Sequence, residues 1–130
     1  MQDQFIAGAV IYAKDIGRVS QFYSELAGLP ILQQEPDHVL LESTKFQLVV
    51  VAIAPAIADQ IVISSPPERR ENTAIKLCFA VQSLATAREV AMRLGGELNS
   101  PEREWEFQGY KVCDAHDPEG NVFQVRASML

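Results

Sequence analysis

The sequence predicts an α+β domain in which one βαβββ arrangement occurs twice. Apolar runs of strand length alternate with two helix-like stretches in the order expected for such modules. Three pairs of landmarks share one spacing: the helix caps Asp15 and Ser83 (83 − 15 = 68), Leu26 and Leu94 (94 − 26 = 68), and Gly28 and Gly96 (96 − 28 = 68). A constant spacing of this kind indicates an internal repeat.

The first module is predicted from a strand, a helix and three shorter strands. Residues 5–13 are apolar almost throughout, which is typical of a strand that is buried on both faces. Asp15 is a good N-cap for the amphipathic helix that follows, and Gly28 ends that helix. The three further strands are expected at residues 31–34, 38–42 and 46–53.

The second module repeats this order after a connector. Residues 54–72 contain three prolines and a charged run, so we expect a connector there, with an extra short strand possible at residues 60–63. A strand at 73–81, a helix capped by Ser83 and a polar, aromatic loop at 99–108 should follow, with hairpin strands at 109–115 and 121–127. We therefore expect one domain, 1–130, made of module 1 (about 1–54), a connector (about 55–72) and module 2 (about 73–130).

The closing hairpin carries the most specific motif in the chain. Asp117, Pro118 and Gly120 suit the first, second and fourth positions of a type I turn, and Val122-Phe123-Gln124-Val125 then reads as a strand. This hairpin resembles that of the vicinal oxygen chelate superfamily, which includes glyoxalase I, bleomycin-resistance proteins and extradiol dioxygenases. The resemblance implies a glyoxalase/bleomycin-resistance-type fold with a cleft between the two sheets.

Composition argues against several classes of partner. The net charge of −6 and the pI near 4.8 argue against nucleic acid or an anionic membrane as a partner, because phosphate binding needs clustered Lys and Arg. Met1–Gln4 show no signal peptide and no membrane span is visible, so we expect a cytoplasmic protein. Cys78 and Cys113 form no CxxC pair and are expected to be reduced thiols that lie in the core or line a cavity.

The resemblance also implies four positions for metal ligands, one on the first strand and one on the last strand of each module. In this chain the four positions are Gly8, Gln47, Lys76 and Gln124. Glycine has no side chain, a lysine ammonium donates no lone pair, and two neutral amides bind a divalent cation poorly. We therefore expect neither a metal ion nor another cofactor.

Two histidines could in principle replace the missing ligands. His38 follows a turn and His116 precedes one, so for each we expect a surface or hydrogen-bonding role.

Strand alternation predicts what the cleft contains. If Gln47, Lys76 and Gln124 face the cleft, then Val49, Val51, Cys78, Ala80, Val122 and Arg126 should face it too, whereas Leu48, Val50, Leu77, Phe79, Phe123 and Val125 should face the helices. The candidate ligand-binding residues are Gln47, Lys76, Gln124, Arg126, Trp105, Cys78 and Tyr12. Their chemistry suits a small, partly apolar ligand with an anionic or carbonyl end.

Two of these candidates have a structural alternative. Lys76 could pair with a carboxylate or extend into solvent instead of binding a ligand. Trp105, with Phe107 close by, could form a lid or stacking wall, or could pack against the edge of the module or a dimer contact.

Three functions remain open at the level of sequence. The first is a metal-independent small-molecule binding protein of the glyoxalase/bleomycin-resistance type, for which the resemblance implies a homodimer. The second is a lyase, isomerase or dioxygenase-like enzyme that uses Lys76 or an unconventional metal site at Gln47 and Gln124. The third is a protein with a collapsed cleft that acts only through its surface.

Overall fold

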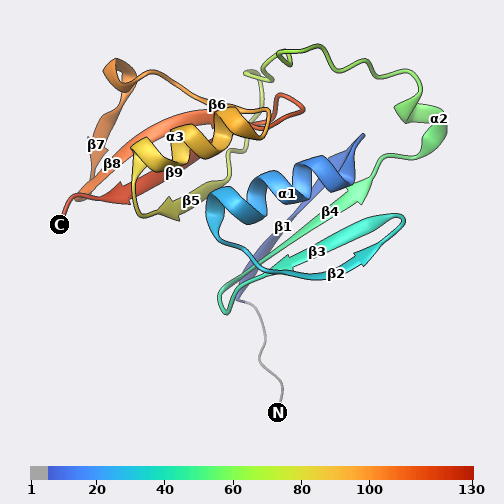
Figure 1. Cartoon of the computed structure of the whole chain (residues 1–130), viewed down its shortest axis with the longest axis horizontal. Helices are drawn as coiled ribbons and strands as arrows, with labels where there is room; N and C mark the ends of the chain where they lie inside the picture. Colours follow the sequence, from blue (N-terminus) through green and yellow to red (C-terminus); the bar gives the residue numbers. More distant parts are fainter. Residues whose placement is uncertain (1–5) are drawn as a thin grey trace. The chain divides into compact units, whose positions relative to one another are not determined.

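The computed structural model describes residues 6–130, which divide into two compact units with the boundary between Val62 and Ile63 (Figure 1). Residues 1–5 lie outside the described residues, so the start of the predicted first strand at Phe5 and the predictions for Met1–Gln4 are not tested. The unit boundary lies within the predicted connector.

The first unit has the predicted βαβββ arrangement. Its elements are β1 (Ala7–Ala13), α1 (Ile16–Ala27), β2 (Ile31–Glu35), β3 (His38–Glu42) and β4 (Phe46–Ala52). The sheet order is β1-β4-β3-β2, with β1 parallel to β4 and the other neighbours antiparallel. Within this unit α1 lies along one face of the sheet (Figure 1).

Local sequence signals place α1 as predicted. The Asp15 side chain accepts a hydrogen bond from the Arg18 backbone N–H at 3.0 Å, and Gly28 ends the helix with φ of 69°. The face of α1 toward the sheet buries Val19, Phe22, Tyr23 and Leu26. Burial of these large side chains stabilises the unit by about 1.5–3 kcal/mol for each side chain.

The connector contains a short helix and no strand. Following α2 (Pro55–Ala58), the backbone N–H groups of Gln60 and Ile61 donate to the carbonyls of Ile57 and Ala58, each at 3.0 Å. The prediction of a strand at residues 60–63 is therefore wrong, because these backbone groups continue helical turns instead of joining a ladder.

The second unit repeats the strand order of the first. Its elements are β5 (Cys78–Val81), α3 (Leu84–Arg93), β6 (Glu97–Leu98), η1 (Pro101–Arg103), β7 (Trp105–Phe107), β8 (Tyr110–His116) and β9 (Val122–Ser128). The sheet order is β5-β9-β8-β6, and β7 pairs with the other end of β8. Ser83 caps α3 through a bond from the Thr86 N–H at 3.2 Å, as predicted.

Two predicted boundaries in this unit are wrong. The first strand begins at Cys78 instead of residue 73, because the Gln124 N–H donates to the Leu77 carbonyl (2.8 Å) and residues 73–76 make no ladder with β9. The predicted loop at 99–108 contains β7, which turns into β8 through Gln108 and Gly109. Both turn residues have positive φ, 49° and 83°, as a two-residue hairpin of type I′ requires.

The closing turn forms as predicted and is held by its first residue. The Gly120 N–H donates to the Asp117 carbonyl at 3.0 Å, and the fully buried Asp117 carboxylate accepts from the Glu119 and Asn121 N–H groups at 2.8 and 3.0 Å. The connector packs on this turn, because the Arg70 N–H donates to the Gly120 carbonyl at 2.8 Å.

Across residues 6–130, neither the length nor the hydropathy of any helix is sufficient for a membrane crossing.

Candidate functional site

Each sheet has one face covered by its helix and one face that the helix does not cover, which we call the open face. On the covered faces Leu48, Val50, Phe79, Phe123 and Val125 are buried and Leu77 is partly buried. The predicted burial of this set against the helices is therefore confirmed, whereas the orientation of the other set toward a cleft stays a prediction. Gln47, Lys76, Cys78, Gln124 and Arg126 keep partial or full exposure.

In the first unit the open face carries an acid–amide pair. Gln47 and Glu42 are opposite one another in the β3–β4 ladder, and the Gln47 amide N–H donates to a Glu42 carboxylate oxygen at 2.9 Å. Tyr12 lies on the neighbouring β1 and is 65% exposed. It is therefore not a core residue of this unit, and a ligand could reach its side chain.

The candidate metal position at Gly8 has no room for a ligand side chain. Gly8 is opposite Gln47 in the β1–β4 ladder, and a Cβ atom built on Gly8 would lie 2.6 Å from the Gln47 carbonyl oxygen. A histidine at this position would require the backbone to move.

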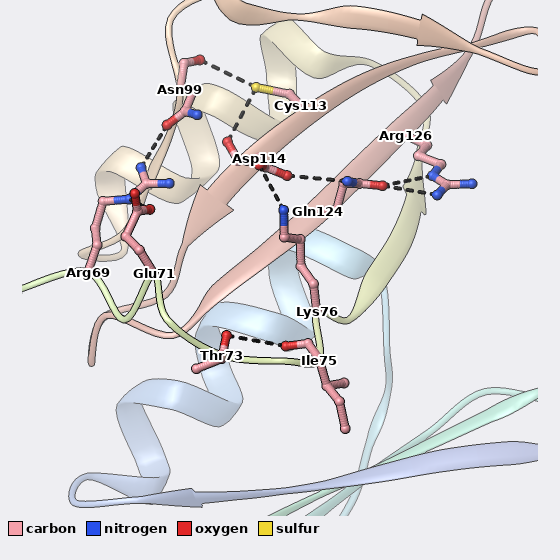
Figure 2. A network of polar contacts seen from close by, with 10 residues as sticks. All are labelled: Arg69, Glu71, Thr73, Ile75, Lys76, Asn99, Cys113, Asp114, Gln124 and Arg126. Carbon is pink, nitrogen blue, oxygen red and sulfur yellow. Dashed lines mark hydrogen bonds and ion pairs between the residues drawn. The ribbon is translucent and has the colours of Figure 1, made fainter.

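In the second unit a chain of polar contacts runs across the open face (Figure 2). The Lys76 ammonium lies 2.9 Å from one oxygen of Asp114, and the Gln124 amide N–H donates to the other oxygen at 3.3 Å. The Arg126 guanidinium then donates to the Gln124 carbonyl oxygen through Nε (3.1 Å) and Nη2 (3.0 Å). Asp114 and Gln124 are opposite one another in the β8–β9 ladder, so this unit repeats the acid–amide pair of the first.

The ladders correct one predicted equivalence. The spacing of 68 residues between the helix landmarks makes Lys76 the counterpart of Gly8 (8 + 68 = 76). The ladders differ: Gly8 is opposite Gln47, but the residue opposite Gln124 is Cys78. Lys76 lies two residues earlier and reaches the pair through its long side chain, which ends on Asp114. Helix caps align the repeat, but they do not define the pairing of the strands.

The surroundings of the two cations differ. Lys76 is paired with a carboxylate, which is the structural alternative that the sequence left open. Within residues 6–130, the Arg126 guanidinium contacts the Gln124 amide oxygen and the Phe107 ring, whose centroid lies 5.1 Å from the guanidinium carbon. No carboxylate among these residues forms an ion pair with Arg126, so nothing in this part of the chain neutralises its positive charge.

Three aromatic side chains lie on the same face of the sheet as Arg126. Trp105 is opposite Val112, which is opposite Arg126, so these residues form one row across β7, β8 and β9. Phe107 shares the face of Trp105 because they are two residues apart in a strand. We call Trp105, Phe107, Tyr110 and Arg126 the aromatic end of the sheet, in which the three rings are 40%, 46% and 39% exposed.

The two thiols have different positions and are both free. Cys78 is exposed on the open face, and partial burial raises the pKa of its thiol although the positive charge of Arg126 opposes this. Cys113 is buried on the covered face, and desolvation raises the pKa of its thiol as well. Its Sγ donates to the Asn99 carbonyl at 3.4 Å.

The histidines have hydrogen-bonding roles, as expected. His38 Nδ1 lies 2.8 Å from an Asp37 carboxylate oxygen, and the buried His116 has Nδ1 3.0 Å from the Asp117 carbonyl oxygen. No group of three or more His, Cys, Asp or Glu side chains among residues 6–130 is arranged to hold a metal ion.

Sequence reasoning did not place Asp114, Glu42 or Arg88 at the site. Asp114 and Glu42 are the acids opposite the two glutamines, and counting back through each hairpin turn would have found them. Arg88 binds the segment before β7: its Nη2 lies 2.5 Å from a Glu104 oxygen and 2.9 Å from the Asn99 carbonyl. No local pattern marks Arg88, because its partners lie 11 and 16 residues away.

The comparison with known families covers nearly the whole chain. The profile of a family described as "Glyoxalase-like domain" matches residues 8–126. No curated protein matches the sequence.

Solved structures with low sequence identity share the fold. One is a glyoxalase/bleomycin resistance protein/dioxygenase family enzyme from Burkholderia phytofirmans PsJN, with a TM-score of 0.68, 20% identity and coverage of 96% of this chain and 99% of that chain. A protein of unknown function from Agrobacterium tumefaciens str. C58 has a TM-score of 0.63 and 22% identity, with 98% and 97% covered. A glyoxalase/bleomycin resistance protein from Albidiferax ferrireducens T118 has a TM-score of 0.63 and 16% identity, with 95% and 97% covered.

Proposed function

The chain belongs to the glyoxalase-like domain family, and from this premise we propose that it binds a small, partly apolar ligand with an anionic or carbonyl end and does so without a metal ion. The observation that carries the proposal is the polar chain on the second open face, in which two side-chain cations contact the acid–amide pair. An open face with apolar residues and an unneutralised guanidinium suits such a ligand.

The donor set supports the absence of a metal ion. The Gln124 carbonyl oxygen already accepts two N–H bonds from Arg126, and Asp114 is already paired with Lys76. A divalent cation at these oxygens would have to displace two positive groups or lie close to them, which costs electrostatic energy. In the first unit the Gly8 position has no room for a ligand side chain, which supports the same conclusion.

The enzyme alternative receives less support from the contacts. A lysine that acts as a base needs access to the reacting atom, and the Lys76 ammonium is held on Asp114 at 2.9 Å. An unconventional metal site at Gln47 and Gln124 would use amides that already bond to Glu42, Asp114 and Arg126. Ligand binding therefore remains the proposal. The cleft between the modules, the homodimer and the cytoplasmic location stay predictions.

The test is thermal unfolding of the full chain in a buffer with a chelator, against a panel of small organic anions and uncharged carbonyl compounds. We expect at least one compound to raise the melting temperature progressively with its concentration, because a ligand that binds the folded state alone stabilises it by about 2.7 kcal/mol at 100 times its Kd. Arg126→Gln should reduce the shift given by an anion. Lys111→Gln is the matched control, since Lys111 alternates with Val112 and so lies on the other face. No shift with any compound, or shifts that require an added divalent ion, would contradict the proposal.

A further inference from the structure

We propose that the aromatic end of the second sheet is a subsite for a planar aromatic carboxylate, with the carboxylate on Arg126 and the ring against Trp105 and Phe107. This inference rests on the proposed function and names the chemical class of its ligand. It also moves the anion-binding role from Lys76 to Arg126.

The first step is the distribution of charge on the open face. Lys76 and Asp114 form an ion pair, so together they offer an incoming anion little net charge. Within residues 6–130, the Arg126 guanidinium contacts a neutral amide oxygen and an aromatic ring, and neither cancels its charge. The electrostatic attraction of an anion to this face should therefore be strongest beside Arg126.

The second step is the geometry of the guanidinium. Its Nε and Nη2 atoms use one edge to hold the Gln124 oxygen, which leaves the Nη1 hydrogens and the second Nη2 hydrogen along another edge. Nη1 carries no contact to the drawn residues in Figure 2. Two parallel N–H groups on this edge match the two oxygens of a carboxylate, which is the bidentate contact that arginine favours over lysine.

The third step is the rigidity of the guanidinium. Gln124 holds it by two hydrogen bonds, Asp114 holds Gln124, and the Phe107 ring lies beneath it at 5.1 Å. An arginine held in place before the ligand arrives loses less conformational freedom on binding. The polar chain thus fixes the position of the Arg126 guanidinium. Lys76 and Asp114 are positioning residues, because they act on Arg126 through Gln124.

The fourth step is the aromatic surface beside the cation. Trp105, Phe107 and Tyr110 stay between 39% and 46% exposed although each belongs to or borders a strand pair. Trp105 and Arg126 are two strands apart on one face, about 10 Å, which is on the scale of a single-ring acid. Stacked or edge-on aromatic contacts add about 0.5–1.5 kcal/mol beyond buried area, which corresponds to an affinity gain of about two- to tenfold.

The experiment is calorimetric titration of the full chain with three matched probes: benzoate, cyclohexanecarboxylate, which keeps the charge but is not planar, and benzamide, which keeps the ring but is neutral. Benzoate should bind about two- to tenfold more tightly than cyclohexanecarboxylate and at least about tenfold more tightly than benzamide. Fluorescence of Trp105, the chain's one tryptophan, should change with benzoate over the same concentrations.

Variants assign these preferences to the proposed groups. Arg126→Gln should weaken benzoate at least about tenfold and leave benzamide unchanged, and Arg126→Lys should recover little because it lacks the planar edge. Phe107→Leu should remove the preference for benzoate over cyclohexanecarboxylate. Lys76→Met should weaken benzoate less than Arg126→Gln does, because Lys76 acts only through Asp114 and Gln124, and the opposite-face control Lys111→Gln should not change the affinity. Circular dichroism checks that each variant is folded.

The outcomes separate this inference from the proposed function. The proposed aromatic subsite is contradicted if cyclohexanecarboxylate binds as tightly as benzoate, or if Arg126→Gln leaves the affinity for benzoate unchanged. The proposal of small-molecule binding is not contradicted by either result. The same holds if none of the three probes binds but another compound of the thermal panel does. If no compound of either set binds, the proposed function fails and this inference fails with it.

Discussion

Lys76 and Arg126 are both cations on the second open face, and their neighbours give them different roles. Alternation along strands was enough to place Arg126, Gln124 and Cys78 on that face, because successive side chains of any strand point to opposite faces of the sheet. Alternation could not reveal that Asp114 neutralises Lys76, because that contact spans 38 residues. Which cation can receive an anion is therefore decided by tertiary contacts that the sequence does not show.

At the same scale, the buried thiol of Cys113 predicts a dependence of stability on pH. Burial raises the pKa of this thiol in the folded state above its ordinary value of 9.0, so the unfolded thiol ionises first as pH rises. The unfolded state is then favoured, and the free energy of unfolding should fall as pH rises through 9 toward the folded pKa. Below about pH 8 the thiol is protonated in both states and should contribute no slope.

The measurement is urea unfolding of wild type and Cys113→Ala at about pH 7.5, 9 and 10 under reducing conditions. Other groups titrate in this range, so the difference between the two proteins is the quantity of interest. Wild type should lose stability relative to Cys113→Ala as pH rises, because only wild type has a thiol that ionises more readily in the unfolded state. A difference that stays constant with pH would contradict a raised pKa for Cys113.

At the scale of elements, strong local signals predicted α1, α3 and the closing turn, whereas the sequence predicted a loop where β7 forms. Asp15, Ser83 and Gly28 act through contacts within a few residues, so their sequence patterns are sufficient. β7 is three residues long and turns through Gln108-Gly109, which lacks the Asn-Gly or Asp-Gly signal of a two-residue hairpin. Its position depends on Arg88, which belongs to α3.

Arg88→Met tests the anchoring of the segment that leads to β7. The guanidinium bonds to the Asn99 carbonyl and to the Glu104 carboxylate, whose side chain is only 11% exposed, and the variant leaves both without this partner. We expect the free energy of unfolding to fall by about 2–4 kcal/mol and Trp105 to become more mobile. Urea unfolding and Trp105 fluorescence anisotropy measure the two effects.

Arg103→Met is the matched control for Arg88→Met. Arg103 is exposed in η1, and its side chain makes no hydrogen bond or ion pair with residues 6–130, so its loss should change stability by less than about 0.5 kcal/mol. Equal effects of the two substitutions would show that Arg88 does not anchor this segment.

Gly120→Ala tests the packing of the connector on the closing turn. Gly120 has φ of 87°, and an added Cβ would lie 2.0 Å from the Glu68 carbonyl oxygen, so the connector backbone would have to move. Gly28→Ala is the matched control, because Gly28 has φ of 69° but no atom within 4 Å of its added Cβ.

We expect Gly28→Ala to cost about 1 kcal/mol, which is the cost of the left-handed conformation alone. Gly120→Ala should cost clearly more, because a steric clash adds to the same conformational cost. Chemical denaturation of the two variants provides the comparison. Similar losses would show that the connector is not held against the turn.

For the molecule as a whole, the repeat predicted two βαβββ modules and the closing hairpin indicated the family, but neither predicted the strand pairing. The two hairpins that join the acid to the amide differ in length, with Ser43–Lys45 in one and Asp117–Asn121 in the other. No single spacing therefore relates Glu42–Gln47 to Asp114–Gln124. Both units nevertheless place an acid opposite a glutamine, and this shared pair is the core of the account.

The central claim is that the side-chain oxygens of Asp114 and Gln124 are bound by the cations Lys76 and Arg126 and not by a metal ion. The most direct test is metal quantification on the full chain after equilibration with Zn²⁺, Ni²⁺ or Mn²⁺ and removal of free ions, for wild type and Gln124→Ala. The account predicts far less than one ion per chain and no dependence on Gln124. One tightly held ion per chain that is lost in Gln124→Ala would contradict it.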